Sequence, residues 1–385
     1  MKYRTILAAL CAVSLFGCEE VLLTPVEEED PQEEPAVLLE DVARVLSLVP
    51  LGGEQLDEVY DAARASATNG YDEEYRMQEL FAEPGCGVGD AGGTKADAYS
   101  KPLRELLREA VHSTKASTGL EDPDAWLDAL SASDIQIYWP FSEEWNGDTK
   151  PVITFDPGGD AVQNEGYVVE ADGTVTKVLV TEEMAQKQPV WVINRNSDAE
   201  YKTLEMLRRE DPDWGHGGGG LIVTKGEEEF RTLVLRSVKC HRNFDSWLAG
   251  ASELVFRMAK VEDFKASTEA ELRLYDPAIT DFMVVVRRGQ KGEKVILNTV
   301  LVSEWTQQLS NCGFMITEDD GGTQTSWKCS AVVKYKSQSY GFEVDLPFHT
   351  RDDIIWRGSV SRNFVERNSG KPVNLGDVEV VMELI

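Results

Sequence analysis

The run TLVLRSVKC, residues 232 to 240, and the run SELVFRMAKV, residues 252 to 261, decide the fold of the larger part of the chain. Both are rich in apolar and β-branched residues, and both are bounded by polar or glycine-containing segments, which is typical of strands. Eight further runs of this kind follow: AELRLYD, DFMVVVRR, KVILNTVLV, CGFMITE, SWKCSAVVKY, YGFEVDL, DIIWRGSV and DVEVVMELI. Strand-like runs separated by turns, with almost no helical pattern, predict an antiparallel β-sandwich over residues 231–385.

The region before these runs mixes the two patterns. In DIQIYWPF the apolar Ile135, Ile137 and Trp139 alternate with other residues, and EGYVVEADGTVTKVLV divides into two strand-like halves about Asp172-Gly173. PVWVINRNSD has the composition of a short buried strand, and TLEMLRRED that of a short helix. Residues 132–230 are therefore predicted to form an α+β region.

Residues 36–131 carry a helical pattern. Leu38, Val42, Val45, Leu46 and Val49 recur at steps of three and four, as on one face of a helix. Similar patterns occur in EQLDEVYDAARASA, DEEYRMQELF, KPLRELLREAVHS and DPDAWLDALSA. The predicted fold class is α+β, with a helical N-terminal region followed by a β-rich region that ends in an antiparallel sandwich.

The first residues have the pattern of an export signal. Lys2 and Arg4 precede the apolar segment TILAALCAVSLF, which is shorter than the about 20 residues needed to span a bilayer. The segment ends in LFGC, which resembles the lipobox of bacterial lipoproteins. The resemblance implies that residues 1–17 are a signal peptide and that Cys18 becomes a lipidated N-terminus. The alternative is an ordinary secretory peptide in which the cysteine is incidental.

Residues 18–35 are predicted to be an acidic, disordered tether. The segment contains prolines and eight acidic residues, so it cannot bury enough apolar surface to fold. Its character is similar to the acidic stretch of surface lipoproteins in Bacteroidota, and YWPFSEEW, PVWVINRNSD and ITEDDGGTQTSWKC resemble uncharacterised lipoproteins of gut Bacteroidota. These resemblances imply a lipid-anchored protein of the outer membrane, periplasmic or surface-exposed, and imply no activity.

The charge balance excludes one class of partner. The chain has 38 Lys and Arg against 68 Asp and Glu, for a formal net charge of −30. Nucleic-acid binding requires clustered basic residues, so nucleic acid is not an expected partner. The acidity either serves solubility or forms a cation site.

Acidic loops of the C-terminal region are the candidate metal site. Calcium takes several carboxylate or carbonyl oxygens at about 2.3–2.6 Å, and a sandwich gathers its loops at its ends. The alternative for each residue is a turn or a solvated loop. The candidate ligands are Asp245, Glu318, Asp319, Asp320, Asp352 and Asp353. NRNSDAEYKTLE also has the spacing of a calcium loop but lacks its glycine, so we prefer a polar connection there.

One disulfide is a candidate. A two-residue hairpin turn at Asp320-Gly321 would place Cys312 opposite Cys329 on neighbouring strands. An oxidising envelope would allow the bond. The alternative is a pair of reduced, buried cysteines.

Three tryptophans lie in or beside polar segments, where an exposed indole would stack on a sugar or peptide ring. They are Trp139, Trp145 and Trp247. The alternative is a place in the core, which is the more common position of large aromatic residues.

Motifs for catalysis are incomplete. HGGGG at residues 216–220 is similar to the oxyanion loop of esterases, but no GxSxG elbow accompanies it, and the four histidines are dispersed with no HExxH. The sequence therefore favours a lipid-anchored binding or interaction protein with a candidate calcium site. The alternative is a secreted hydrolase whose active-site residues are dispersed along the chain.

Overall fold

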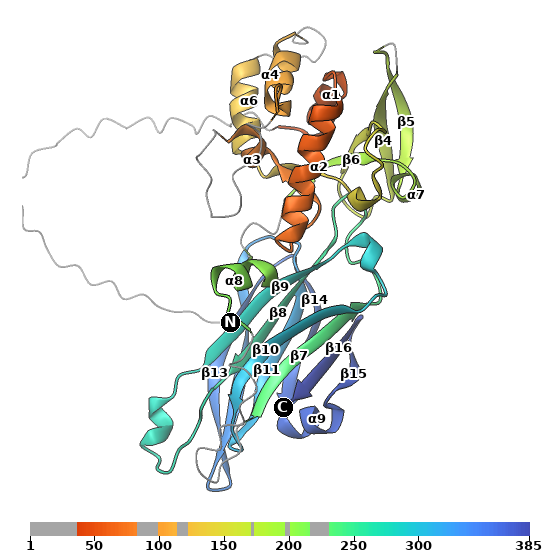
Figure 1. Ribbon diagram of the computed structural model, residues 1–385. Coiled ribbons are helices and arrows are strands. Elements are labelled where there is room, and N and C mark those ends of the chain that lie inside the picture. The colour runs from red at the N-terminus through yellow and green to blue at the C-terminus, as the bar shows by residue number, and fades with distance from the viewer. Residues whose placement is uncertain (1–36, 83–98, 114–121, 171–172, 197–200, 216–230) are drawn as a thin grey trace, which may run out of the picture. The chain divides into compact units, whose positions relative to one another are not determined.

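The computed structural model describes residues 37–82, 99–113, 122–170, 173–196, 201–215 and 231–385. Residues Pro35–Ile385 form one compact unit, drawn in Figure 1. Helices and largely antiparallel sheets occur together in it, which confirms the mixed α+β class. Among the described residues, no helix has the length and apolar character needed to cross a membrane.

The helices before residue 133 follow the predicted apolar pattern. In α1, Val42, Val45 and Leu46 are buried, and the helix ends two residues before Pro50. The side chain of Asp122 caps α6 by accepting the N–H groups of Asp124 and Ala125. The bounds are α1 Leu39–Leu48, α2 Gly53–Thr68, α3 Met77–Phe81, α4 Leu103–Ser113 and α6 Pro123–Ala132. DEEYRMQELF is only partly helical, because its first half forms strand β1 before α3 begins.

The first sheet has the strand order β1-β2-β6-β3-β4-β5, in which only β3 and β6 pair in parallel. Its strands are β1 Glu74–Arg76, β2 Ile135–Tyr138, β3 Val152–Phe155, β4 Gln163–Val169, β5 Val175–Thr181 and β6 Val190–Arg195. The two halves predicted about Asp172-Gly173 are the antiparallel pair β4 and β5.

Strand β6 is buried on both faces. Trp191 and Ile193 join the core formed with the helices α1 to α6, whereas Val190 and Val192 join a second core that contains Trp247 and Leu248. The loop between β7 and β8 thus covers the face of the first sheet that the N-terminal helices leave open.

The C-terminal strands form two sheets. One has the order β10-β7-β16-β15, and the other has the order β13-β12-β11-β8-β9, with β14 paired to β11. Their bounds are β7 Arg231–Cys240, β8 Ser252–Lys260, β9 Ala278–Val286, β10 Val295–Trp305, β11 Leu309–Glu318, β12 Gln324–Tyr335, β13 Gln338–His349, β14 Asp353–Ser361, β15 Lys371–Leu375 and β16 Val378–Leu384.

Nine of the ten predicted runs are strands, and one is wrong. AELRLYD contains the 3-10 turn Glu271–Leu274 instead. The sequence patterns also missed β15 and helix α9, Arg362–Asn368, which precedes it. Two further short helices are α7, Glu182–Ala185, and α8, Leu204–Glu210, of which α8 was expected.

One core joins the two C-terminal sheets. Leu233 and Leu235 of β7 lie in the same buried cluster as Leu254 and Phe256 of β8 and Phe314 of β11. Since side chains alternate along a strand, the intervening residues of β8 and β11 face the other way.

Strands β12 and β13 cover part of that opposite face. Ala259 and Met315 form a small core there with Val344 and Leu346 of β13. A side chain at Gly313 would collide with the sulfur of Cys329, so glycine at position 313 lets β12 approach β11 closely.

The predicted cross-strand register is therefore wrong. Beyond Asn311, β11 pairs with β8 and β14, while Cys329 of β12 pairs with Val344 of β13. Cys312 lies in the core between the sheets, and Cys329 lies on the opposite side of β11. Both are free thiols, as is Cys240. The disulfide fails because its two cysteines lie on opposite sides of a strand.

Candidate functional site: an acidic cleft

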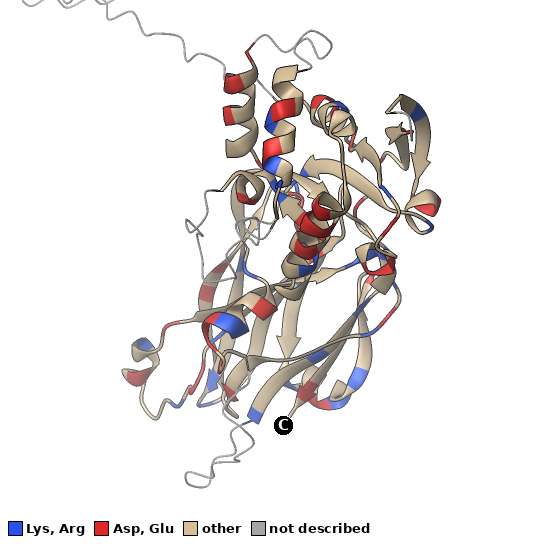
Figure 2. Cartoon of the chain, turned by 45° about the horizontal axis from the view of Figure 1, so that its top comes forward, with Lys and Arg blue, Asp and Glu red and all other residues tan. Residues whose placement is uncertain are grey.

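A cleft of about 340 Å³ lies where the first sheet meets the β7–β8 loop and the end of β11. Figure 2 shows that acidic residues are distributed over helices, strands and loops. Among the described residues, however, seven carboxylate residues converge in the cleft, and Arg195 is the single Lys or Arg of the lining. The lining residues are Leu39, Asp72, Glu74, Gln136, Asp156, Pro157, Gly158, Arg195, Asn196, Asp245, Ala249, Gly250, Glu253, Asp319 and Asp320.

Three carboxylates from separate segments form the first candidate group. Asp245 is in the loop after β7, Glu253 is the second residue of β8, and Glu318 is the last residue of β11. One oxygen from each lies within 4.8 Å of the others. The backbone holds two of these segments together, because the N–H of Asp319 donates to the carbonyl of Glu253 at 3.1 Å.

Burial makes ionisation of these three carboxyl groups unfavourable. Glu253 and Glu318 are buried, and Asp245 is partly exposed. Desolvation raises the pKa of Glu318, and the adjacent carboxyl of Asp245 raises it further. Desolvation also raises the pKa of Asp245. Two carboxyls this close do not both ionise readily, so a proton or a bound cation has to offset their charge.

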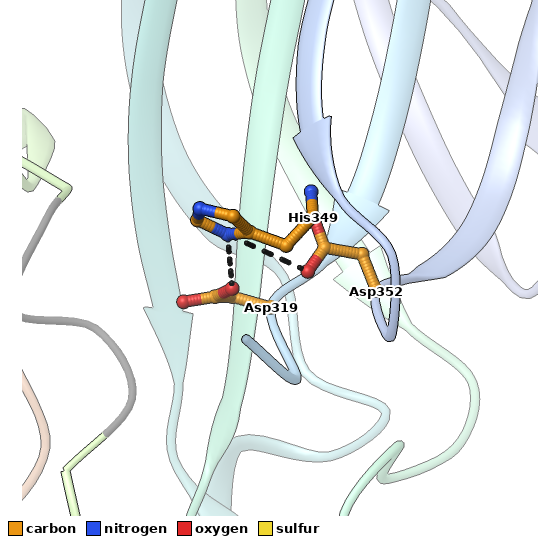
Figure 3. A group of neighbouring side chains, drawn as sticks. All are labelled: Asp319, His349 and Asp352. Atoms are coloured by element: carbon orange, nitrogen blue, oxygen red, sulfur yellow. Dashed lines mark hydrogen bonds and ion pairs between the residues drawn. The ribbon is translucent and has the colours of Figure 1, made fainter. Parts of the chain in front are cut away.

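The second candidate group is Asp319, His349 and Asp352, shown in Figure 3. Nδ1 of His349 lies 3.3 Å from Oδ1 of Asp319 and 3.9 Å from Oδ1 of Asp352. The same nitrogen lies 3.1 Å from the hydroxyl of Tyr201, whose ring packs against the imidazole. All three members of the group are buried.

The hydrogen bonds of this second group order two loops. The carboxylate of Asp352 accepts the backbone N–H groups of His349 and Asp320, at 2.8 and 3.3 Å. Asp319 accepts the N–H of Gly321 at 3.1 Å. These bonds join the turn after β11 to the turn after β13, and so they fix the position of Asp320 at the edge of the cleft.

The predicted metal ligands divide between these places. Asp245 and Glu318 belong to the first group, and Asp319 and Asp352 to the second. Asp320 lines the cleft, where burial and the neighbouring carboxylates raise its pKa to about 6. Asp353 is wrong as a ligand, since it lies more than half exposed and pairs with Arg242 on the surface.

Two members of these groups were missed. Glu253 lies in a strand-like run, where an acidic side chain is expected to face solvent. His349 is an isolated histidine at the end of a strand. In the structure every residue of β8 except Lys260 is buried, Glu253 included. A charged residue in such a place needs a partner.

Comparison with models of protein families, with curated proteins and with solved structures gave no match. Function is therefore inferred from the geometry of the site.

The tryptophans are mainly core residues. Trp139 and Trp247 are only 1% and 2% exposed, so neither can stack on an external ligand. Trp145 is half-buried, packs against Tyr60 and Trp139, and lines a separate pocket of about 190 Å³. Its indole N–H donates to the carbonyl of Thr149, which fixes the ring in place.

Two sequence motifs contribute nothing to the cleft. The HGGGG segment and Asp198 lie outside the described residues. Within the described part of NRNSDAEYKTLE, the amide of Asn194 donates to the carbonyls of Leu248 and Ala249, and the amide of Asn196 donates to Glu74 and Gln136. Asn194 and Asn196 thus join segments rather than form a calcium loop.

Proposed function

We propose that the protein is a lipid-anchored cell-envelope protein whose folded unit binds a cation in the acidic cleft. The observation that supports this is the convergence of seven carboxylate residues from distant parts of the sequence on one cleft. In the part of the chain that the structure describes, Arg195 is the one basic residue of its lining. The guanidinium of Arg195 is already paired with Asp134. Negative charge concentrated in a partly desolvated cleft attracts cations and disfavours anionic ligands.

Binding of a cation is tested by titration calorimetry of the full chain in detergent, with CaCl2, ZnCl2 and spermidine as separate probes. We expect at least one probe to bind stoichiometrically, and the double substitution Asp245→Asn, Asp319→Asn to weaken it at least tenfold. Asp148→Asn, at an exposed position outside the cleft, is the matched control. Binding of no probe, or equal binding by the double variant, contradicts the proposal.

The anchor is proposed from the N-terminal sequence. Cys18 is the expected site of lipidation, and the acidic segment to residue 35 would hold the folded unit away from the bilayer surface. The proposed location is the outer membrane, on its periplasmic or outer face. Cys18→Ala is expected to move the protein from the membrane to the soluble fraction and to remove the acyl mass from the N-terminal peptide. A wild-type chain without that mass contradicts the anchor.

We also propose that residues 231–385 form an antiparallel β-sandwich. The support is the shared core of the two C-terminal sheets, to which β7 and β16 contribute from one side and β8 and β11 from the other. A sandwich gathers loops at its ends. This accounts for Asp245, which follows β7, lying close to Glu318, which ends β11.

A hydrolase is the second candidate function. The specific observation in its favour is the pair Asp245 and Glu318, since two carboxyls that share a proton are a common general acid and base. Turnover of an ester, peptide or glycoside substrate by the full chain, abolished by Glu318→Gln, would favour this function over binding alone.

A further inference from the structure

One buried carboxylate oxygen beside the cleft has no hydrogen-bond partner among the described residues. Glu318 is 1% exposed, and none of the described residues offers a donor to its Oε1. An unpaired polar atom of this kind costs about 1–3 kcal/mol, and more when the group is charged. The neighbours of Glu318 are themselves carboxylates, so the missing partner has to be positively charged or a donor.

The spacing of the first group fits one ion. Two oxygens that each lie about 2.3–2.6 Å from a common calcium ion are at most about 4.6–5.2 Å apart. The oxygens of Asp245, Glu253 and Glu318 satisfy this limit, since all lie within 4.8 Å of one another. The three residues come from a loop and from two paired strands, so the fold fixes their relative positions.

We propose that Asp245, Glu253 and Glu318 bind a calcium ion at the wall of the cleft. This inference rests on the proposed function, and it names the ion and its ligands. The ligands are carboxylate oxygens without nitrogen or sulfur, which is the donor set of a hard cation. Three carboxylates supply up to six oxygens, and the open side of the cleft admits water to the remaining positions. Calcium tolerates such irregular coordination, whereas magnesium requires a nearly ideal octahedron.

Arg288 does not replace the ion. Its guanidinium donates to the backbone carbonyl of Asp245 at 2.8 Å and to the carboxylate of Glu182 at 3.0 and 3.1 Å. Its positive charge offsets part of the negative charge around Asp245. Its N–H groups, however, donate to the Asp245 backbone carbonyl and to Glu182, and none of these bonds goes to the Asp245 carboxylate. One oxygen of that carboxylate lies within 4.8 Å of an oxygen of Glu318.

The group of His349 is not the proposed calcium site. Its imidazole suits zinc better than calcium, and both oxygens of Asp352 accept backbone N–H groups. It supports the site from behind, because it orders the turn that begins directly after Glu318.

The test is equilibrium dialysis of the full chain against radioactive calcium, in the presence of magnesium. We expect one calcium ion per chain, and at least tenfold weaker binding in each of Glu318→Gln, Glu253→Gln and Asp245→Asn. Asp148→Asn, at an exposed position outside the cleft, is expected to retain the wild-type affinity. Glutamine keeps the shape of a protonated Glu318, and near-ultraviolet circular dichroism checks that each variant is folded.

Four results overturn the calcium site. Calcium binding that survives Glu318→Gln places the ion elsewhere. Zinc binding that is lost in His349→Gln, without calcium binding, assigns the metal to the other group and leaves a cation-binding cleft in place. A chain that binds spermidine but no metal also keeps the proposed function and rejects the ion, whereas a chain that binds none of these probes rejects both.

Discussion

The buried carboxyl groups of this protein differ in whether hydrogen-bond donors reach both of their oxygens. Glu58 is 3% exposed, but it accepts the hydroxyl of Tyr75 and the N–H of Leu103, so its burial is satisfied within the fold. Glu318 has a similar exposure and one oxygen without a donor in the described part of the chain. Burial alone therefore does not identify a site. A site is indicated where a buried oxygen has no hydrogen-bond donor.

Glu73 makes stability depend on pH. It is buried, accepts the hydroxyl of Ser142, and lies next to Glu143. Desolvation raises its pKa above the usual value near 4.5, and the hydrogen bond with Glu143 adds to the shift. The folded state therefore holds a proton that the unfolded state releases. The stabilisation is complete below pH of about 4.5 and is lost as pH rises through the raised pKa.

We expect the midpoint of thermal unfolding in EDTA to fall between pH 5 and pH 8, and to fall less in Glu73→Gln, which mimics the protonated acid. Glu144→Gln, at an exposed position, is the control and should follow the wild type. An identical pH profile for Glu73→Gln and wild type would show that Glu73 does not contribute.

The free thiols also lead to a prediction. Burial raises the pKa of Cys240 to about 12 and that of Cys329 to about 11, and burial likewise raises that of Cys312. We expect iodoacetamide to label none of the three rapidly in the native protein, because the thiolate is the reactive form. All three should react after unfolding without any reductant. Labelling of Cys312 and Cys329 only after reduction would instead support the disulfide predicted between them.

The helices, strands and turns show where local sequence patterns predicted the structure and where they did not. The apolar composition of β8 and the helical period in α1 predicted both elements, because β8 is buried on both faces and α1 buries one face. The Asp320-Gly321 turn was misread, because β14 and β8 occupy the edges of β11 that β12 was expected to take. The true hairpin, β12 to β13, turns at Lys336 and Ser337, which carry positive φ without any glycine. No turn motif marks it.

This turn leads to a prediction about stability. Ser337 has a φ of 66°, a conformation that costs a residue with a side chain about 1–2 kcal/mol relative to glycine. Ser337→Gly is therefore expected to raise the free energy of unfolding by roughly 0.5–1 kcal/mol, after the greater unfolded-state entropy of glycine is included. Urea unfolding measures it. Ser330→Gly, within β12, is the matched control and should lower stability. A lower free energy of unfolding for Ser337→Gly would contradict the described turn.

At the scale of the whole molecule, the sequence indicated the composition of the site better than its geometry. Acidic loops near the ends of the C-terminal strands were recognisable, and four of the six candidates meet in two pairs, Asp245 with Glu318 and Asp319 with Asp352. Glu253 was not recognisable, because its role depends on strand pairing that brings β8 beside β11. The cleft also needs residues of the first sheet, such as Asp72, which precedes β1 and accepts the N–H of Ala251. Such long-range contacts have no local pattern.

The most direct measurement of the central claim is the thermal unfolding of the full chain at pH 7, first in EDTA and then in excess calcium. A ligand at one hundred times its Kd stabilises the native state by about 2.7 kcal/mol. We predict a rise of the unfolding midpoint for the wild type and for the control Asp148→Asn, and no rise for Glu318→Gln. A wild-type midpoint that calcium leaves unchanged, or an equal rise in Glu318→Gln, would contradict a calcium ion bound in the acidic cleft.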